Sequence, residues 1–165
     1  MTDHKGISRR RALGTLGFLG AVAATGTLDV VAPRPVSAQA LGLQENVQEA
    51  MRRLFGSRPI KDGSGVIKLD APLIAENGAL VQVGVQVQSP MMPGNHVKHI
   101  YVVADKNRIP VVTRIALAPE AGQAAVGASI RLGETGDLRA IVEQSDGSLL
   151  QVKREVKVTV GGCGG

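Results

Sequence analysis

Apolar and polar residues alternate with a period of two through much of residues 66–160. The clearest run is 80–88, where Val81, Val83, Val85 and Val87 alternate mainly with glutamines. Successive side chains of a strand point to opposite faces, so this run predicts a strand with one buried face. Further apolar runs predict strands at 66–69, 97–104, 110–118, 125–132, 138–143 and 149–160.

A different spacing precedes the strands. Between Gln44 and Phe55 apolar residues recur every three or four positions, and Gly56 follows. This pattern predicts a short amphipathic helix. The run 145–148 (Ser-Asp-Gly-Ser) predicts a hairpin between the last two strands. No strands alternate with helices, so we predict an all-β fold, an immunoglobulin-like antiparallel β-sandwich with a short N-terminal helix.

Composition and charge narrow the possible partners. Apolar residues make up 44% and charged residues 20% of the chain, which is enough to form a packed core. Aromatic residues, the usual platforms for stacked bases, are only 2%, and this disfavours nucleic-acid binding. Of the net charge of +5, residues 1–40 supply five basic and two acidic side chains, so residues 41–165 carry only +2. A net charge of only +2 on residues 41–165 does not suggest a polyanion partner.

The first forty residues have the pattern of an export signal. Ser8, Arg9 and Arg10 precede an uncharged Gly- and Ala-rich stretch, and an Ala-x-Ala site ends at Ala40. This order predicts a twin-arginine signal peptide, residues 1–40, cleaved after Ala40, and a periplasmic mature protein. The stretch is too weakly apolar for a stable membrane anchor.

The sole cysteine, Cys163, lies between Gly161-Gly162 and Gly164-Gly165. Glycine loses the most conformational entropy on ordering, so the pattern predicts a flexible arm, residues 161–165, attached to a domain at 41–160. A catalytic cysteine is normally held beside a base, and no Lys, Arg or His lies in the arm. Cys163 is therefore a candidate for covalent substrate attachment, with activation supplied by partners.

Other candidate sites are weaker. His96 and His99 would lie on opposite faces of a strand, with no further ligands for a metal, so we expect surface histidines. Four basic residues could bind an anion, although a solvated helix face is the commoner case; they are Arg52, Arg53, Arg58 and Lys61. Met91-Met92 fits either packing or a partner contact. No catalytic constellation or cofactor motif is evident, so the chain is not expected to be an enzyme or to hold a metal or cofactor.

The ending at 156–165, the twin-arginine signal, the segment 72–81 and Lys106-Asn107 resemble the SoxY family, sulfur carriers of the thiosulfate-oxidising Sox system. The resemblance implies an immunoglobulin-like fold and a SoxZ-like subunit, in a heterodimer or heterotetramer. It also implies that SoxXA joins thiosulfate to Cys163 as a cysteine S-thiosulfonate. SoxB would then release sulfate, and in some systems SoxCD would oxidise the remaining sulfur.

Two other classes of protein remain as alternatives. A structural β-sandwich module could use Cys163 for an intermolecular disulfide. A ubiquitin-like carrier could be activated at its glycines, but adenylation needs cytoplasmic ATP, and the strand pattern does not fit a compact α/β fold.

Overall fold

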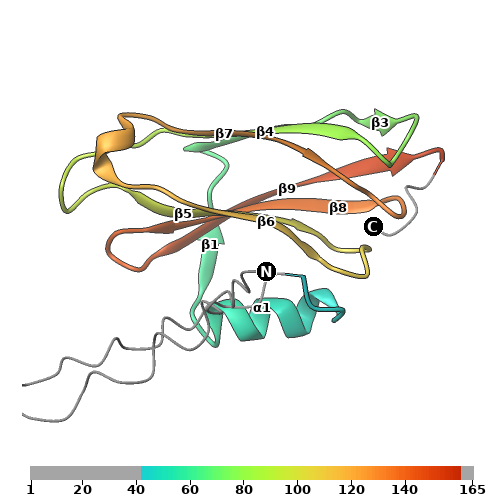
Figure 1. The fold of residues 1–165 in the computed structure, drawn as a ribbon. Helices are drawn as coiled ribbons and strands as arrows, with labels where there is room; N and C mark the ends of the chain where they lie inside the picture. The colour runs from blue at the N-terminus through green and yellow to red at the C-terminus, as the bar shows by residue number, and fades with distance from the viewer. Residues whose placement is uncertain (1–41, 161–165) are drawn as a thin grey trace, which may run out of the picture. The chain divides into compact units, whose positions relative to one another are not determined.

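A computed structural model describes residues 42–160, which form two stacked β-sheets and one α-helix (Figure 1). The larger sheet has the order β1-β9-β8-β5-β6, with β3 also paired to β9, and the smaller sheet has the order β2-β4-β7. Most pairs are antiparallel, while β1 and β3 run parallel to β9. The predicted immunoglobulin-like antiparallel sandwich is confirmed. The strands are β1 (Ile60–Asp62), β2 (Ile67–Asp70), β3 (Ile74–Ala75), β4 (Val81–Val87), β5 (Val97–Ala104), β6 (Val111–Ala116), β7 (Ala124–Ile130), β8 (Gly136–Gln144) and β9 (Leu149–Val158).

The main core lies between the two sheets. In β4 all four valines are buried and both glutamines are exposed, as the alternation predicted. From the larger sheet, Ile100, Leu138, Val142 and Val156 pack into the same interior. Burying such side chains removes apolar surface from water, which is the main force holding the sheets together.

A second, smaller core explains why β5 lacks alternation. Residues 100–104 of β5 are all buried, because α1 (Val47–Phe55) covers the outer face of the larger sheet. Phe55 of the helix meets Tyr101 edge to face, with ring centroids 5.0 Å apart. Strand β5 is thus packed on both faces, between the helix and the smaller sheet.

The helix begins later than the sequence predicts. Asn46 is its N-cap and accepts a bond from the Glu49 N–H, while the Glu49 carboxylate accepts one from the Asn46 N–H. This capping box keeps residues 44–46 out of the helix. The strands β1 and β3 and the 3-10 turn η1 (Pro119–Ala121) were not predicted, since each is only two or three residues long.

Several expectations fall on residues outside those described. The signal residues Ser8, Arg9 and Arg10, the cleavage site after Ala40, and the arm 161–165 all lie there. Between residues 42 and 160, the structure contains no helix with the length and apolar character needed to span a membrane.

Candidate functional site

The end of β9 carries the chain toward Cys163, and one side of it is held by the segment 73–78. Strand β3 pairs with Lys157 and Val158 of β9. Residues that flank β3 form further backbone hydrogen bonds to the end of β9. The Thr159 hydroxyl also donates to the Glu76 carbonyl. The backbone bonds join Lys157 N to Leu73 O at 2.9 Å, Thr159 N to Ala75 O at 3.1 Å and Gly78 N to Val160 O at 2.7 Å.

The other side of β9 is held by the loop between β7 and β8. The Thr135 hydroxyl accepts a 2.9 Å bond from the Val158 N–H. Asn107 braces this loop: its amide donates to the Arg131 carbonyl at 2.7 Å and accepts from the Gly133 N–H at 2.9 Å. Among the described residues, Asn107 is the buried polar side chain. In the sequence, Lys106-Asn107 contributes to the family resemblance, but the pattern predicts no structural role for Asn107.

These bonds define an anchored root, residues 156–160 together with 73–78 and Thr135. The backbone is bonded as far as the Val160 carbonyl, although β9 itself ends at Val158 rather than at 160 as predicted. Arg154 lies in β9 between the parts that pair with β1 and β3, and its guanidinium donates to the Ala71 carbonyl at 2.8 Å. The structure therefore fixes the point from which residues 161–165 start.

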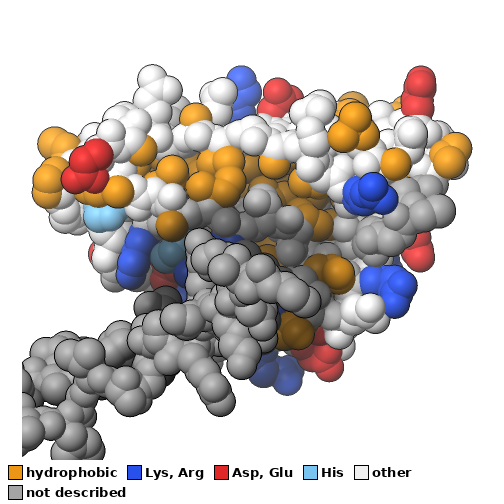
Figure 2. All heavy atoms as spheres, viewed as in Figure 1, with side chains coloured by type: hydrophobic (Ala, Val, Ile, Leu, Met, Phe, Trp, Pro, Cys, Tyr) orange, Lys and Arg blue, Asp and Glu red, His pale blue; other side chains and the backbone are white. Residues whose placement is uncertain are grey.

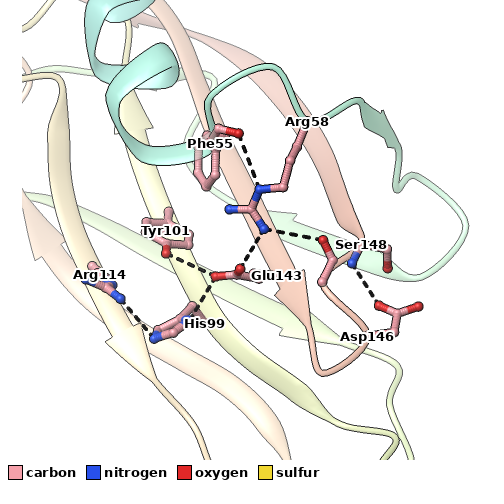
Figure 3. A network of polar contacts seen from close by, with 9 residues as sticks. Phe55, Arg58, His99, Tyr101, Arg114, Glu143, Asp146 and Ser148 are labelled. Atoms are coloured by element: carbon pink, nitrogen blue, oxygen red, sulfur yellow. Dashed lines mark hydrogen bonds and ion pairs between the residues drawn. The ribbon is translucent and has the colours of Figure 1, made fainter.

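A separate polar network lies on the outer face of the larger sheet (Figure 3). Glu143 of β8 accepts from Arg58 at 2.8 Å, from the Tyr101 hydroxyl at 3.3 Å and from His99 Nδ1 at 3.0 Å. Arg114 of β6 lies 3.1 Å from His99 Nε2. A guanidinium can only donate, so Nε2 must accept, and the imidazole is neutral with its proton on Nδ1.

The environment of this network shifts the pKa values of its members. Burial, followed by the charge of Arg114, lowers the pKa of His99. Burial would raise the pKa of Glu143, but bonds from Arg58 and His99 hold it below its usual value. Burial also raises the pKa of Tyr101. The network joins the loop that follows α1 to strands β5, β6 and β8. Its contacts favour an ionised Glu143 beside a neutral His99.

This arrangement makes stability depend on pH. Because the His99 pKa is lower in the folded chain, the unfolded chain binds the proton first, and stability falls as pH drops below the ordinary histidine pKa of 6.5. We expect His99→Gln, which keeps one donor and one acceptor, to flatten this fall in urea-unfolding free energy between about pH 7 and pH 5. The expected difference is on the order of 1 kcal/mol.

The matched control is His96→Gln, since His96 contacts Ser145 through its backbone and lies outside the network. Comparison with this control separates the contribution of the His99 side chain from a general effect of replacing a histidine. An identical pH slope in His99→Gln would show that His99 is not the titrating group. At lower pH Glu143 contributes a further fall, because its stabilising contacts are lost as pH drops from the ordinary glutamate value of 4.5 toward its lowered pKa.

The predicted basic cluster is partly neutralised. Arg53 bonds to Glu45, which raises the Arg53 pKa, and Arg58 bonds to Glu143. An open hollow of about 430 Å³ beside α1 is lined by Arg52 and Arg58, but Lys61 and Arg53 do not line it. The cluster is therefore not gathered into one anion site.

The expectation for the histidines was wrong in one respect. Within 42–160 no group of three or more residues that could ligate a metal occurs. His99 is not a plain surface histidine, however, because its side chain is only 15% exposed and contacts Glu143 and Arg114. The two methionines also differ: Met91 is buried at a positive φ of 48°, whereas Met92 is exposed.

The chain matches one family of proteins and is similar to several solved structures. The family described as "Sulfur oxidation protein SoxY" matches residues 51–163. The solved "sulfur carrier protein SoxY from Chlorobium limicola f thiosulfatophilum" is 33% identical, with a TM-score of 0.58, and the match covers 70% of this chain and 97% of that chain. No curated protein matches the sequence.

A second solved structure resembles the fold alone. Superoxide reductase (neelaredoxin) from Ignicoccus hospitalis is 23% identical, with a TM-score of 0.50, over 56% of this chain and 80% of that chain. At this identity the likeness concerns the sandwich and carries nothing about chemistry.

Fold and root together define a class: an immunoglobulin-like sandwich whose last strand is anchored on both sides and leads into a glycine-flanked cysteine. The family match includes both this strand and Cys163. The chain belongs to the SoxY family of sulfur oxidation proteins.

Proposed function

We propose that the protein is a periplasmic carrier that binds thiosulfate-derived sulfur on Cys163 and presents it to the enzymes of sulfur oxidation. The observation that carries this proposal is the continuity of the chain from the anchored root into the Gly-Gly-Cys-Gly-Gly arm, within one family match that ends at residue 163. A rigid mount with a glycine-flanked thiol suits delivery to several partner sites.

The loading step joins the Cys163 sulfur to the outer sulfur of thiosulfate. The thiol loses its proton, a sulfur–sulfur bond forms, and two electrons leave to an oxidant, which we propose is the haem protein SoxXA. Because the arm contains no Lys, Arg or His, the partner is proposed to stabilise the thiolate. In this proposal the chain itself catalyses no step and needs no metal or cofactor.

The unloading step is hydrolytic. In the proposed reaction SoxB uses water to cleave the bond between the two thiosulfate sulfurs, so that sulfate and two protons are released and a persulfide anion stays on Cys163. Where the host has SoxCD, that enzyme oxidises the outer sulfur further. A SoxZ-like subunit accompanies the carrier throughout, in a heterodimer or heterotetramer.

Intact-mass analysis tests the proposal. The mature protein, purified with its co-eluting subunit, is incubated with thiosulfate and the host's haem oxidase. We expect a mass increase of one thiosulfate-derived group, located at Cys163 by peptide mapping. A disulfide dimer with no adduct under any oxidising condition would instead favour the structural module.

A further inference from the structure

The exposed large hydrophobic side chains of residues 42–160 are concentrated at the arm root. Six such side chains are exposed, and four of them belong to the segment 73–80 or to the last described residue. Figure 2 shows hydrophobic surface at the end of the molecule where β3 lies in Figure 1. The four are Leu73 (69% exposed), Ile74 (57%), Leu80 (67%) and Val160 (63%).

Backbone hydrogen bonds fix the chain from which these four side chains extend. Ile74 is in register with Lys157 on β9, and the Leu73 carbonyl accepts from the same residue's N–H. The Gly78 N–H donates to the Val160 carbonyl, while the Gly78 carbonyl accepts from Leu132, so the segment leading to Leu80 is fixed as well. The four side chains therefore extend from backbone that is hydrogen-bonded beside the end of β9.

The reach of the arm then sets a requirement on any partner. Cys163 is three residues beyond Val160. An extended chain spans at most about 3.5 Å per residue, so the two Cα atoms are at most about 10 Å apart. A protein that acts on the Cys163 sulfur must therefore bring its surface to the surface around Val160.

We propose that four side chains form an apolar collar around the arm root: Leu73, Ile74, Leu80 and Val160. The enzymes that act on Cys163 dock on this collar with the entrances of their active-site channels. This inference rests on the proposed carrier function. The expected occupant is a protein with an apolar rim around a channel that admits the Cys163 Cα to at most about 10 Å from the Val160 Cα, with the sulfur one side-chain length further in. Binding at the collar would place the thiol in the channel in a single docking event.

The small size of the collar favours transient association with an enzyme over permanent association with a subunit. Stable interfaces use roughly 20–30 residues on each side, far more than four side chains. Exposed charged residues border the collar, among them Glu76, Glu134 and Lys157. An apolar centre with a charged rim is the usual anatomy of an interface that forms and separates.

The test compares collar variants in the oxidase reaction. The double variant Leu73→Ser with Leu80→Ser, in the mature protein with its subunit, is titrated against the host's haem oxidase and thiosulfate. We expect the KM for the carrier to rise roughly tenfold or more, with kcat within about twofold, because docking contributes equally to the ground and transition states. Alkylation of Cys163 by iodoacetamide should be unchanged, since a small reagent needs no docking.

Met92→Ser is the matched control, because Met92 is also exposed (55%) and lies in the β4–β5 loop, at the other end of the strands from the arm root. It should leave KM unchanged. An unchanged KM in the double variant, or loss of the co-purifying subunit from it, would overturn the collar proposal. If the unaltered protein forms no adduct with thiosulfate, both the carrier function and the collar proposal fail, whereas an adduct with a normal KM in the variant defeats only the collar.

Discussion

Replacing Cys163 by serine is expected to abolish sulfur attachment completely. The proposed adduct is a sulfur–sulfur bond, which a hydroxyl oxygen cannot form, and Cys163 is the sole cysteine of the chain. Incubation of Cys163→Ser with thiosulfate and the haem oxidase should leave its mass unchanged under conditions where the unaltered protein is converted. The expected loss is on the order of a thousandfold or more in rate, because no second thiol is available.

The same variant should fold normally. Both hydrophobic cores are built from residues 47–156, and the anchored backbone ends at Val160, so a change at 163 removes no buried contact described in the structure. The melting temperature should stay within about 1 °C of the unaltered value, as is usual for substitutions away from buried or hydrogen-bonded features. The control is Gly164→Ser, which adds a hydroxymethyl group beside the thiol but retains the thiol and should still form the adduct. A thiosulfate adduct on Cys163→Ser would contradict the assignment of the attachment site.

The sequence predicted those parts of the fold that depend on local pattern. The valines of β4 alternate because one face is buried, and the bounds of β5 and the hairpin before β9 followed from apolar runs and turn residues. The last hairpin shows why this worked: Gly147 has a φ of +85°, a conformation that glycine adopts at little cost. Such signals need no knowledge of distant contacts.

The parts that failed depend on contacts between distant segments. Strand β3 contains only Ile74 and Ala75, and it is a strand only because β9 runs beside it more than eighty residues later. His99 and Glu143 meet because β5 and β8 pair in a particular register, which a single sequence does not fix. The assignment of Cys163 rests on its neighbours in the sequence and stays a prediction, whereas the collar beside the arm root could be proposed only from the pairing of β3 with β9.

Replacing Arg9 and Arg10 together by lysine is expected to stop export of the protein. Lysine keeps the positive charge but lacks the planar guanidinium with its fixed set of donors, so a receptor that recognises the arginine pair loses its contacts while the net charge is unchanged. After fractionation of cells, the full-length precursor should remain in the cytoplasm and the mature form should be absent from the periplasm. We expect at least a tenfold loss of exported protein, in line with an address read by a receptor.

The control for this prediction is Arg11→Lys, which makes the same chemical change one residue outside the proposed pair. It should be exported normally, and this comparison separates recognition of the pair from a general demand for arginine. Equal export of the double variant and the unaltered protein would contradict the twin-arginine assignment. A retained precursor would also keep Cys163 in a reducing compartment, where glutathione and thioredoxin maintain thiols and oxidative loading is opposed. Loss of export should therefore remove the sulfur adduct from cells even though the carrier, purified and supplied with oxidase, still accepts thiosulfate.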